Sequence, residues 1–182
     1  MEIIFTADFL VNMLSAGVRL AAPLLMAALG EIITERSGLL NIGIEGMLLL
    51  GALFAVFGSD VSGSPWIGAL SAMLAGAIIG LIFAFITVTL AGDQVVTGTA
   101  INILALGLST YLFRLAYGLE GASREVASFQ PLALPVLSQI PFLGPILFRQ
   151  TLLVYLAFLF VPLTAFFLFR TMWGLSLRAV GD

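Results

Sequence analysis

The chain has 182 residues, of which 61% are hydrophobic and only 9% are charged, and its formal net charge is −3. Since a soluble domain carries about 25% charged residues, this composition indicates an integral membrane protein. Cysteine, histidine and lysine are all absent. Their absence excludes disulfides, His/Cys metal sites and Ser-His or Cys-His catalytic pairs, so we expect no enzyme, no metal and no cofactor. The lack of a basic patch argues against nucleic-acid binding.

The apolar stretches predict an all-α, polytopic integral membrane helix bundle with broken helices and about five membrane segments. The first covers residues 9–33, and we expect it to be retained because the N-terminus lacks the positive region of a cleaved signal peptide. Arg19 interrupts this segment, and we expect its side chain to reach toward the nearer membrane surface. Pro23 removes a helical hydrogen bond and predicts a kink.

Residues 35–46 (ERSGLLNIGIEG) are the most polar run in the first half of the chain. Glu35, Arg36 and Glu45 lie here between two apolar segments, where ionisable side chains are costly and point to function. Backbone polar groups cannot stay unpaired in lipid, so a non-helical stretch must pack in protein or line a cavity. We interpret this run as a helix break that faces a transport route. Glu45 could also pair with Arg36 across the break, which we favour over direct substrate contact.

The second segment is short, because only residues 47–57 form an uncharged apolar run. It either recruits residues 42–46 in order to span the bilayer or forms a half-helix, as in transporters whose broken helices meet near the midplane. Both alternatives keep Glu45 out of free water. Residues 58–64, which are rich in glycine and serine, predict a turn.

The third segment, residues 65–90, is uncharged and begins with a proline, which suits a first helical turn. Small residues recur in it at every fourth position, and they are Gly68, Ala72, Gly76, Gly80 and Ala84. This pattern favours close packing against another helix over a ligand channel.

The fourth segment, residues 95–113, is uncharged and has a polar first half that includes Thr97, Thr99 and Asn102. Helical spacing places one stripe on a single face, made of Gln94, Gly98, Asn102, Ala105 and Ser109. The opposite face carries Ile103, Leu104 and Leu106. We expect the stripe to face protein or water instead of lipid. Its polar side chains either join helices by hydrogen bonds or line a pathway, and both alternatives stay open here.

Residues 118–150 form a long connection that includes Glu120, Arg124 and four prolines, which forbid one continuous helix. We expect short pieces on the membrane surface and a platform for a partner. The fifth segment, residues 151–169, contains Pro162 and leads into an amphipathic tail at residues 170–182. Five crossings place three arginines on each side of the membrane, so the positive-inside rule does not decide the orientation.

Three motifs together carry a resemblance to a known family. They are ERSGLLNIGIEGM at residues 35–47, QVVTGTAIN at residues 94–102 and TMWGLSLRAVG at residues 171–181. In this order and spacing they resemble the permease subunits of ABC importers for nucleosides and simple sugars, a superfamily that includes branched-chain amino-acid permeases. The resemblance extends from about Leu14 to the end of the chain.

The resemblance implies a plasma-membrane permease region over residues 1–182, with the N-terminus outside. Residues 170–182 would form a cytoplasmic segment that docks on the ABC ATPase subunit through Arg170, Gly174, Leu175, Arg178, Ala179 and Gly181. The proline-rich loop at 118–150 would lie on the outer face, where an extracytoplasmic binding protein delivers substrate. A second permease subunit and membrane lipid are the further partners implied.

The first two motifs are implied to border the translocation route, and their candidate residues are Glu35, Arg36, Asn41, Glu45, Gln94, Thr97 and Asn102. The neutral amides and the hydroxyl among them suit ribose hydroxyls or a base edge. We therefore expect a nucleoside as substrate, and a simple sugar as the second choice. The chain lacks a G-x-x-x-x-G-K-[ST] motif, so a separate ATPase would drive alternating access.

Other functions remain open at this point. One alternative is a proton- or ion-coupled secondary carrier, with Glu35 and Glu45 as the titrating groups. A branched-chain amino-acid ABC permease and a membrane scaffold without transport are two more. Members of the resembling family are longer, with further spans, so we expect this chain to be about half of a permease, either a truncated product or a partial sequence.

Overall fold

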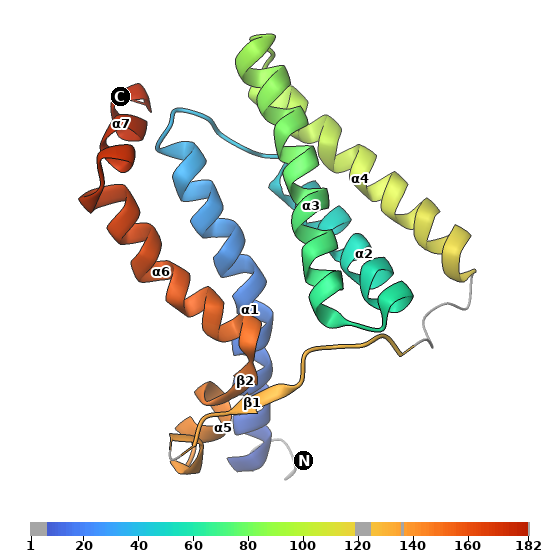
Figure 1. The fold of residues 1–182 in the computed structure, drawn as a ribbon, viewed down its shortest axis with the longest axis vertical. Coiled ribbons are helices and arrows are strands. Elements are labelled where there is room, and N and C mark those ends of the chain that lie inside the picture. The colour runs from blue at the N-terminus through green and yellow to red at the C-terminus, as the bar shows by residue number, and fades with distance from the viewer. Residues whose placement is uncertain (1–6, 119–124, 136, 182) are drawn as a thin grey trace. The chain divides into compact units, whose positions relative to one another are not determined.

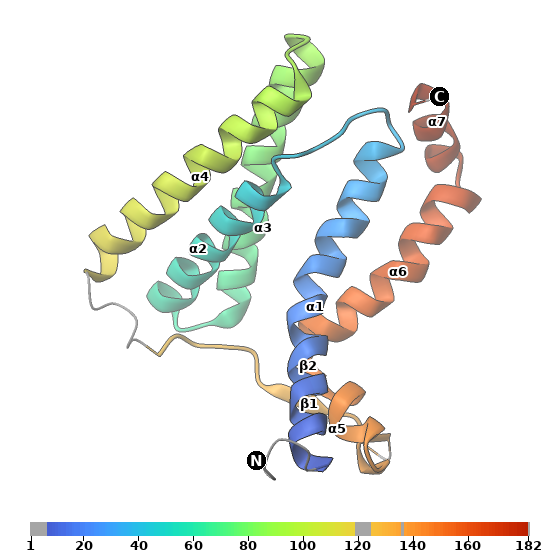
Figure 2. The ribbon, with the colours of Figure 1, turned by 180° about the vertical axis from the view of Figure 1, so that it is seen from behind.

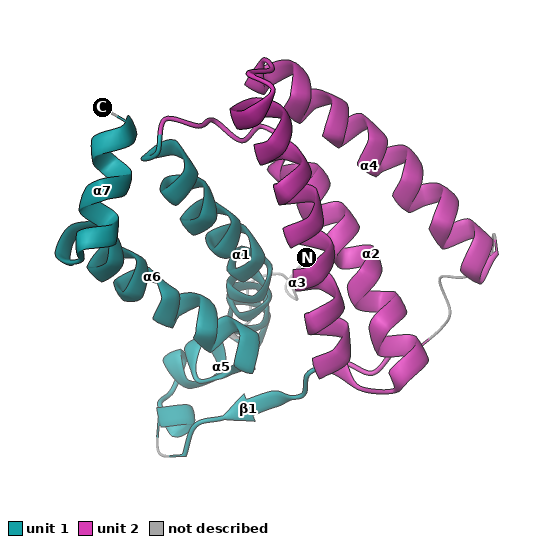
Figure 3. Ribbon diagram, turned by 45° about the horizontal axis from the view of Figure 1, so that its top comes forward, with its two compact units in different colours: residues 1–37, 129–182 teal, residues 38–128 magenta. Residues whose placement is uncertain are grey.

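The computed structural model describes residues 7–118, 125–135 and 137–181 and divides into two compact units (Figures 1 and 3). Unit 1 comprises residues 1–37 and 129–182, and unit 2 comprises residues 38–128. Five helices in the described part are long and apolar enough to cross a membrane. They are Asp8–Glu35, Ile44–Ser62, Pro65–Thr89, Gln94–Tyr117 and Leu152–Arg170. This result confirms the predicted all-α class with five membrane segments.

Unit 2 contains helices α2 (Ile44–Ser62), α3 (Pro65–Ala84) and α4 (Gln94–Tyr117), and α3 continues into a π-helical turn, η2 (Phe85–Thr89). Figure 2 shows α2 beside both α3 and α4, and α2 contacts both of them. Its core is formed by Leu50 and Leu53 of α2 and Ala105 of α4, which are all buried. Helix α2 is therefore the central element of this unit.

Helix α2 corrects two expectations from the sequence. Its 19 residues rise about 28 Å, close to the ~30 Å of the hydrocarbon core, so it is a full span and the half-helix alternative is wrong. The turn predicted at residues 58–64 is shorter than expected, because α2 continues to Ser62 and only Gly63 and Ser64 lie between α2 and α3. Gly58 is helical, and a Cβ there would lie 2.9 Å from Cβ of Ser71, so this glycine permits close packing against α3.

The small residues of α3 contact α2 only in the first half of the helix. A Cβ on Gly68 would lie 2.7 Å from the Ala55 carbonyl oxygen, whereas a Cβ on Gly76 or Gly80 would meet nothing within 4 Å. Beyond Ala72, the buried residues are Ala75, Phe83 and Thr87, and Ala84 is half-buried. Residues spaced four apart shift gradually around a helix that has about 3.6 residues per turn. The small residues in the second half of α3 therefore no longer face α2.

Unit 1 is built on α1 (Ala7–Glu35) and α6 (Leu152–Arg170), which pack together through Ala22, Val154 and Ala157. Pro23 and Pro162 lie inside these helices. The final helix, α7 (Met172–Gly181), contacts α6.

Unit 1 also holds the second part of the proline-rich connection, folded into short elements. They are β1 (Pro131–Ala133), η4 (Leu137–Gln139), α5 (Leu143–Leu147) and β2 (Arg149–Thr151). The two strands pair antiparallel, with Leu132 opposite Gln150, and α5 packs against α1. The sequence analysis did not predict this strand pair. Glu120 and Arg124 lie outside the described residues.

Candidate functional site at the start of α2

The predicted helix break lies between the end of α1 at Glu35 and the start of α2 at Ile44. Its residues 38–43 belong to unit 2, and Gly38 has a φ of 84°, a left-handed conformation that favours glycine. Helix α2 then starts with Gly43 at its N-cap position, where no side chain caps the helix. The first backbone N–H groups of α2 therefore need partners from elsewhere.

Two side chains of α4 bind the backbone around this start, and one of them, Asn102, serves an N–H group of α2 itself. The Gln94 Oε1 atom accepts a hydrogen bond of 2.7 Å from the Leu40 backbone N–H. The Asn102 Oδ1 atom accepts one of 2.7 Å from the Gly46 N–H, and its Nδ2 group donates one of 3.0 Å to the Ile42 carbonyl. Gly46 is the third residue of α2, the position that an N-cap side chain normally serves. Asn102 thus caps α2 from a different helix.

Glycines allow the two backbones to approach at this joint. A Cβ on Gly98 would lie 2.7 Å from the Gly43 nitrogen, and a Cβ on Gly46 would lie 2.9 Å from Asn102 Oδ1. Gly98, Ala105 and Ser109 are buried, whereas the residues of the opposite face are largely exposed. Those exposed residues are Ile103 (69%), Leu104 (63%) and Leu106 (63%). The polar stripe therefore faces protein, as the sequence predicted.

The other candidate pathway residues do not join these hydrogen bonds. Thr97 is buried, and its hydroxyl donates to the Asp93 carbonyl at 2.7 Å. Asn41 is also buried, and its Nδ2 lies 3.5 Å from the Met47 sulfur. Glu45 is exposed in the first turn of α2, where the helix dipole favours a negative charge.

Glu35 and Arg36 are exposed at the end of α1. They belong to unit 1, whereas Glu45 belongs to unit 2, so pairing of Arg36 with Glu45 stays a prediction. Of the seven candidates, the structure brings Gln94 and Asn102 together on the break. Their amides bind the protein's own backbone, which favours the helix-joining role that the sequence left open.

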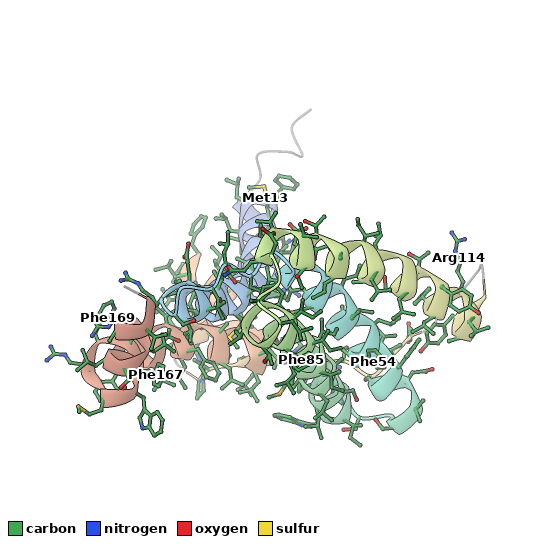
Figure 4. All side chains as sticks on the ribbon, turned by 90° about the horizontal axis from the view of Figure 1, so that it is seen from above. Met13, Phe54, Phe85, Arg114, Phe167 and Phe169 are labelled. Carbon is green, nitrogen blue, oxygen red and sulfur yellow. The ribbon has the colours of Figure 1, made fainter. Side chains whose placement is uncertain are left out.

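The tail helix α7 is capped and held against α6. The Thr171 Oγ1 atom accepts from the Gly174 N–H at 3.1 Å, and a Cβ on Gly174 would lie 2.7 Å from Cα of Leu168. The Arg178 guanidinium lies 5.3 Å from the centre of the Phe169 ring, the α6 residue labelled beside α7 in Figure 4.

Four candidate coupling residues remain exposed around this helix. They are Arg170, Leu175, Ala179 and Gly181. The tail thus presents exposed side chains from a helix whose start is anchored.

Gln150, which is fully buried in unit 1, was not predicted from the sequence. Its Nε2 group donates to Ser15 Oγ at 3.0 Å and to the Ile146 carbonyl at 2.6 Å, joining α1 to the end of α5. Its Oε1 atom has no hydrogen-bond partner among the described residues. One signal was present in the sequence, because Gln150 is a polar residue immediately before an uncharged span.

Comparison with known proteins shows the family of the chain. Residues 13–182 match the family described as branched-chain amino acid transport system, permease component. The chain belongs to this family. It is a multi-pass membrane protein, as its five apolar helices also indicate. No solved structure matches it.

Several curated relatives are similar over most of the chain. The guanosine ABC transporter permease protein NupQ of Bacillus subtilis (strain 168) is 39% identical over 89% of this chain. TsgC13 of Haloferax volcanii, assigned by name to a glucose ABC transporter, is 35% identical over 96%. The nucleoside ABC transporter permease protein NupC of Lactococcus lactis is 34% identical over 89%. These relatives are transporter permeases, and the chain spans about half of their length, 53% of each.

Proposed function

We propose that this chain forms part of the translocation pathway of an ABC importer for nucleosides or simple sugars. The observation that carries the proposal is the family match over residues 13–182, which includes every candidate residue of the pathway and of the tail. A separate ATPase subunit supplies the energy, and the chain, with a second permease subunit, supplies the membrane route.

A nucleoside is our first choice of substrate, and a simple sugar is the second. Two of the relatives described above carry guanosine or nucleoside in their names, and one carries glucose. An uncharged polar substrate also suits a chain in which only 9% of the residues are charged. Glu45, exposed beside the break, is the charged candidate on unit 2.

In this proposal the start of α2 and the first half of α4 move as one body during alternating access. Three hydrogen bonds join them, from Gln94 and Asn102 to the backbone of residues 40–46. Breaking the two Asn102 bonds would leave backbone groups without partners, which costs about 1–3 kcal/mol for each group. A rigid joint therefore passes movement from one helix to the other.

The tail α7 is the proposed contact with the ATPase subunit, which places it in the cytoplasm and the N-terminus outside the plasma membrane. Residues 118–150 then lie on the outer face, where an extracytoplasmic binding protein would deliver substrate. The exposed residues of α7 and its anchored first turn support this role, because a docking helix must be both accessible and firmly attached.

Co-purification with an ABC ATPase subunit from the same source tests the coupling role. We expect the ATPase to be retained by the chain, to be lost on deletion of residues 170–182, and to be weakened by Arg178→Glu. The matched control is Arg149→Glu, an exposed arginine in β2, the strand that leads into α6. Equal retention by the deletion variant would reject the coupling role.

Uptake into vesicles tests transport itself. Vesicles that hold the chain, the ATPase subunit and a second permease subunit should accumulate labelled guanosine only when ATP is present. Labelled glucose serves as the competing substrate. Uptake driven by a pH gradient without ATP would reject the ABC importer and favour a secondary carrier.

A further inference from the structure

A groove of about 370 Å³ runs along unit 2 between α2 and α4. The groove is open along one side. Its lining residues are Leu49, Ala52, Leu53, Val56, Ser109, Thr110, Phe113 and Arg114. The α2 side of the groove, from Leu49 to Val56, is about 10 Å long at ~1.5 Å per residue.

The wall of this groove is mostly apolar, and its two hydroxyl groups both donate hydrogen bonds within α4. Ser109 donates to the Leu106 carbonyl at 3.2 Å, and Thr110 donates to the same carbonyl at 2.8 Å. Leu53, on the facing helix, is buried. An occupant of the groove therefore needs an apolar part, because the wall is mostly apolar and both hydroxyl hydrogens are already bonded within α4.

One end of the groove carries a positive charge. Arg114 lies in the last turn of α4, and its side chain is exposed, at the yellow end of the helix in Figure 4. Among the described residues, the structure gives this guanidinium no ion pair. Arginines near the ends of membrane helices extend toward the headgroup region, where phosphate oxygens are the available anions.

We propose that this groove binds one acyl chain of an anionic phospholipid, whose phosphate contacts Arg114. The apolar wall fits the acyl chain and excludes a polar solute, and the single guanidinium at the end of the groove is complementary to the charged headgroup. The site depends only on α2 and α4, so it is independent of the direction of insertion and of the transported substrate.

Lipid retention in native mass spectrometry tests the proposal. The chain is purified from vesicles of equal phosphatidylglycerol and phosphatidylcholine, and the retained lipids are counted. We expect the wild-type chain to retain phosphatidylglycerol preferentially. Arg114→Gln should lower the preference about fivefold, the effect of one arginine near a charged membrane surface, and Arg114→Lys should keep most of it.

A second variant tests the groove itself. Ala52→Trp fills it and should remove the tightly retained lipid of either headgroup. The matched control is Ala100→Trp, at an exposed position of α4 that does not line the groove. Arg149→Gln is the charge control. Far-UV circular dichroism verifies that each variant keeps its helices.

Three outcomes would overturn the proposal. One is an unchanged lipid preference in Arg114→Gln, as expected if another protein helix fills the groove. The second is full retention in Ala52→Trp. The third is an equal loss in Arg149→Gln, which would show a general attraction of positive charge for anionic lipid.

Discussion

Asn102 of unit 2 and Gln150 of unit 1 each join segments distant in sequence, but their amides differ in how completely they are bonded. In unit 2, Asn102 accepts from Gly46 and donates to Ile42, so both ends of its amide have partners. In unit 1, Gln150 donates to Ser15 and Ile146, while its Oε1 atom has no partner among the described residues. The two residues therefore differ in what their removal costs.

For the free energy of unfolding, leaving a buried group without a partner therefore matters more than losing the hydrogen bond itself. A hydrogen bond contributes only about 1 kcal/mol net, but a buried group left without a partner costs about 1–3 kcal/mol. Removing Asn102 leaves two backbone groups without partners, the Gly46 N–H of α2 and the Ile42 carbonyl just before it. Removing Gln150 also removes an oxygen that has none, which offsets part of the loss.

The largest effect is expected for Asn102→Leu. The substitution leaves the Gly46 N–H and the Ile42 carbonyl unbonded, at about 1–3 kcal/mol for each. The measurement is unfolding in mixed detergent micelles, followed by far-UV circular dichroism. The control is Ile103→Leu, on the exposed face of the same helix. An unfolding midpoint equal to that of the wild type would show that Asn102 does not cap α2.

The next effect is expected for Gly98→Ala. The new Cβ would lie 2.7 Å from the Gly43 nitrogen, so α4 must move away from the start of α2. Overpacking of this kind costs about 1–3 kcal/mol. Gly107→Ala is the matched control, because a Cβ there meets nothing within 4 Å, and it should stabilise the helix by up to ~1 kcal/mol. Equal destabilisation by the two variants would contradict the close approach at Gly98.

Gln150→Leu tests the incompletely bonded amide of unit 1. We expect a loss of about 1 kcal/mol, since the bonds to Ser15 and Ile146 disappear together with the unpartnered Oε1 atom. The same unfolding assay measures it. A loss as large as that of Asn102→Leu would mean that the unpartnered oxygen carries no penalty, and the contrast between the two units would not hold.

The smallest effect is expected for Gln94→Ala. Its bond to the Leu40 N–H is at an exposed position, where water or a headgroup can replace the lost acceptor. We expect a loss of about 0.5 kcal/mol. Hydrogen exchange of the Leu40 amide gives the sharper readout, because it should become faster in the variant while the Gly46 amide remains protected by Asn102. Unchanged exchange at Leu40 would exclude this bond.

Much of the fold could be predicted from the sequence because it depends on local pattern. The apolar runs identified five membrane segments, and the spacing of Gln94, Gly98 and Asn102 identified the protein-facing side of α4. The end of α2 could not be predicted, because glycine has the same weak helix propensity whether it ends a helix or permits packing. Gly58 permits packing here, since Ser71 of α3 lies against it.

The candidate site was predictable in position but not in its contacts. The polar run at residues 35–46 marked the break, yet nothing local shows which groups bind the backbone of Leu40, Ile42 and Gly46. The strand pair around Gln150 could not be predicted either, since strands of three residues are too short to show an alternation of apolar and polar side chains.

The sequence by itself determined that the chain crosses a membrane, which face of α4 turns inward and where the first helix is interrupted. Hydrophobicity and helical period act over a few residues, so they can be read directly from the chain. Only the tertiary structure decided that Asn102 caps α2 and that Gln150 holds α5 to α1. The bonds from Asn102 to Gly46 and from Gln150 to Ser15 join groups that are 56 and 135 residues apart, and their partners are set by how the helices pack.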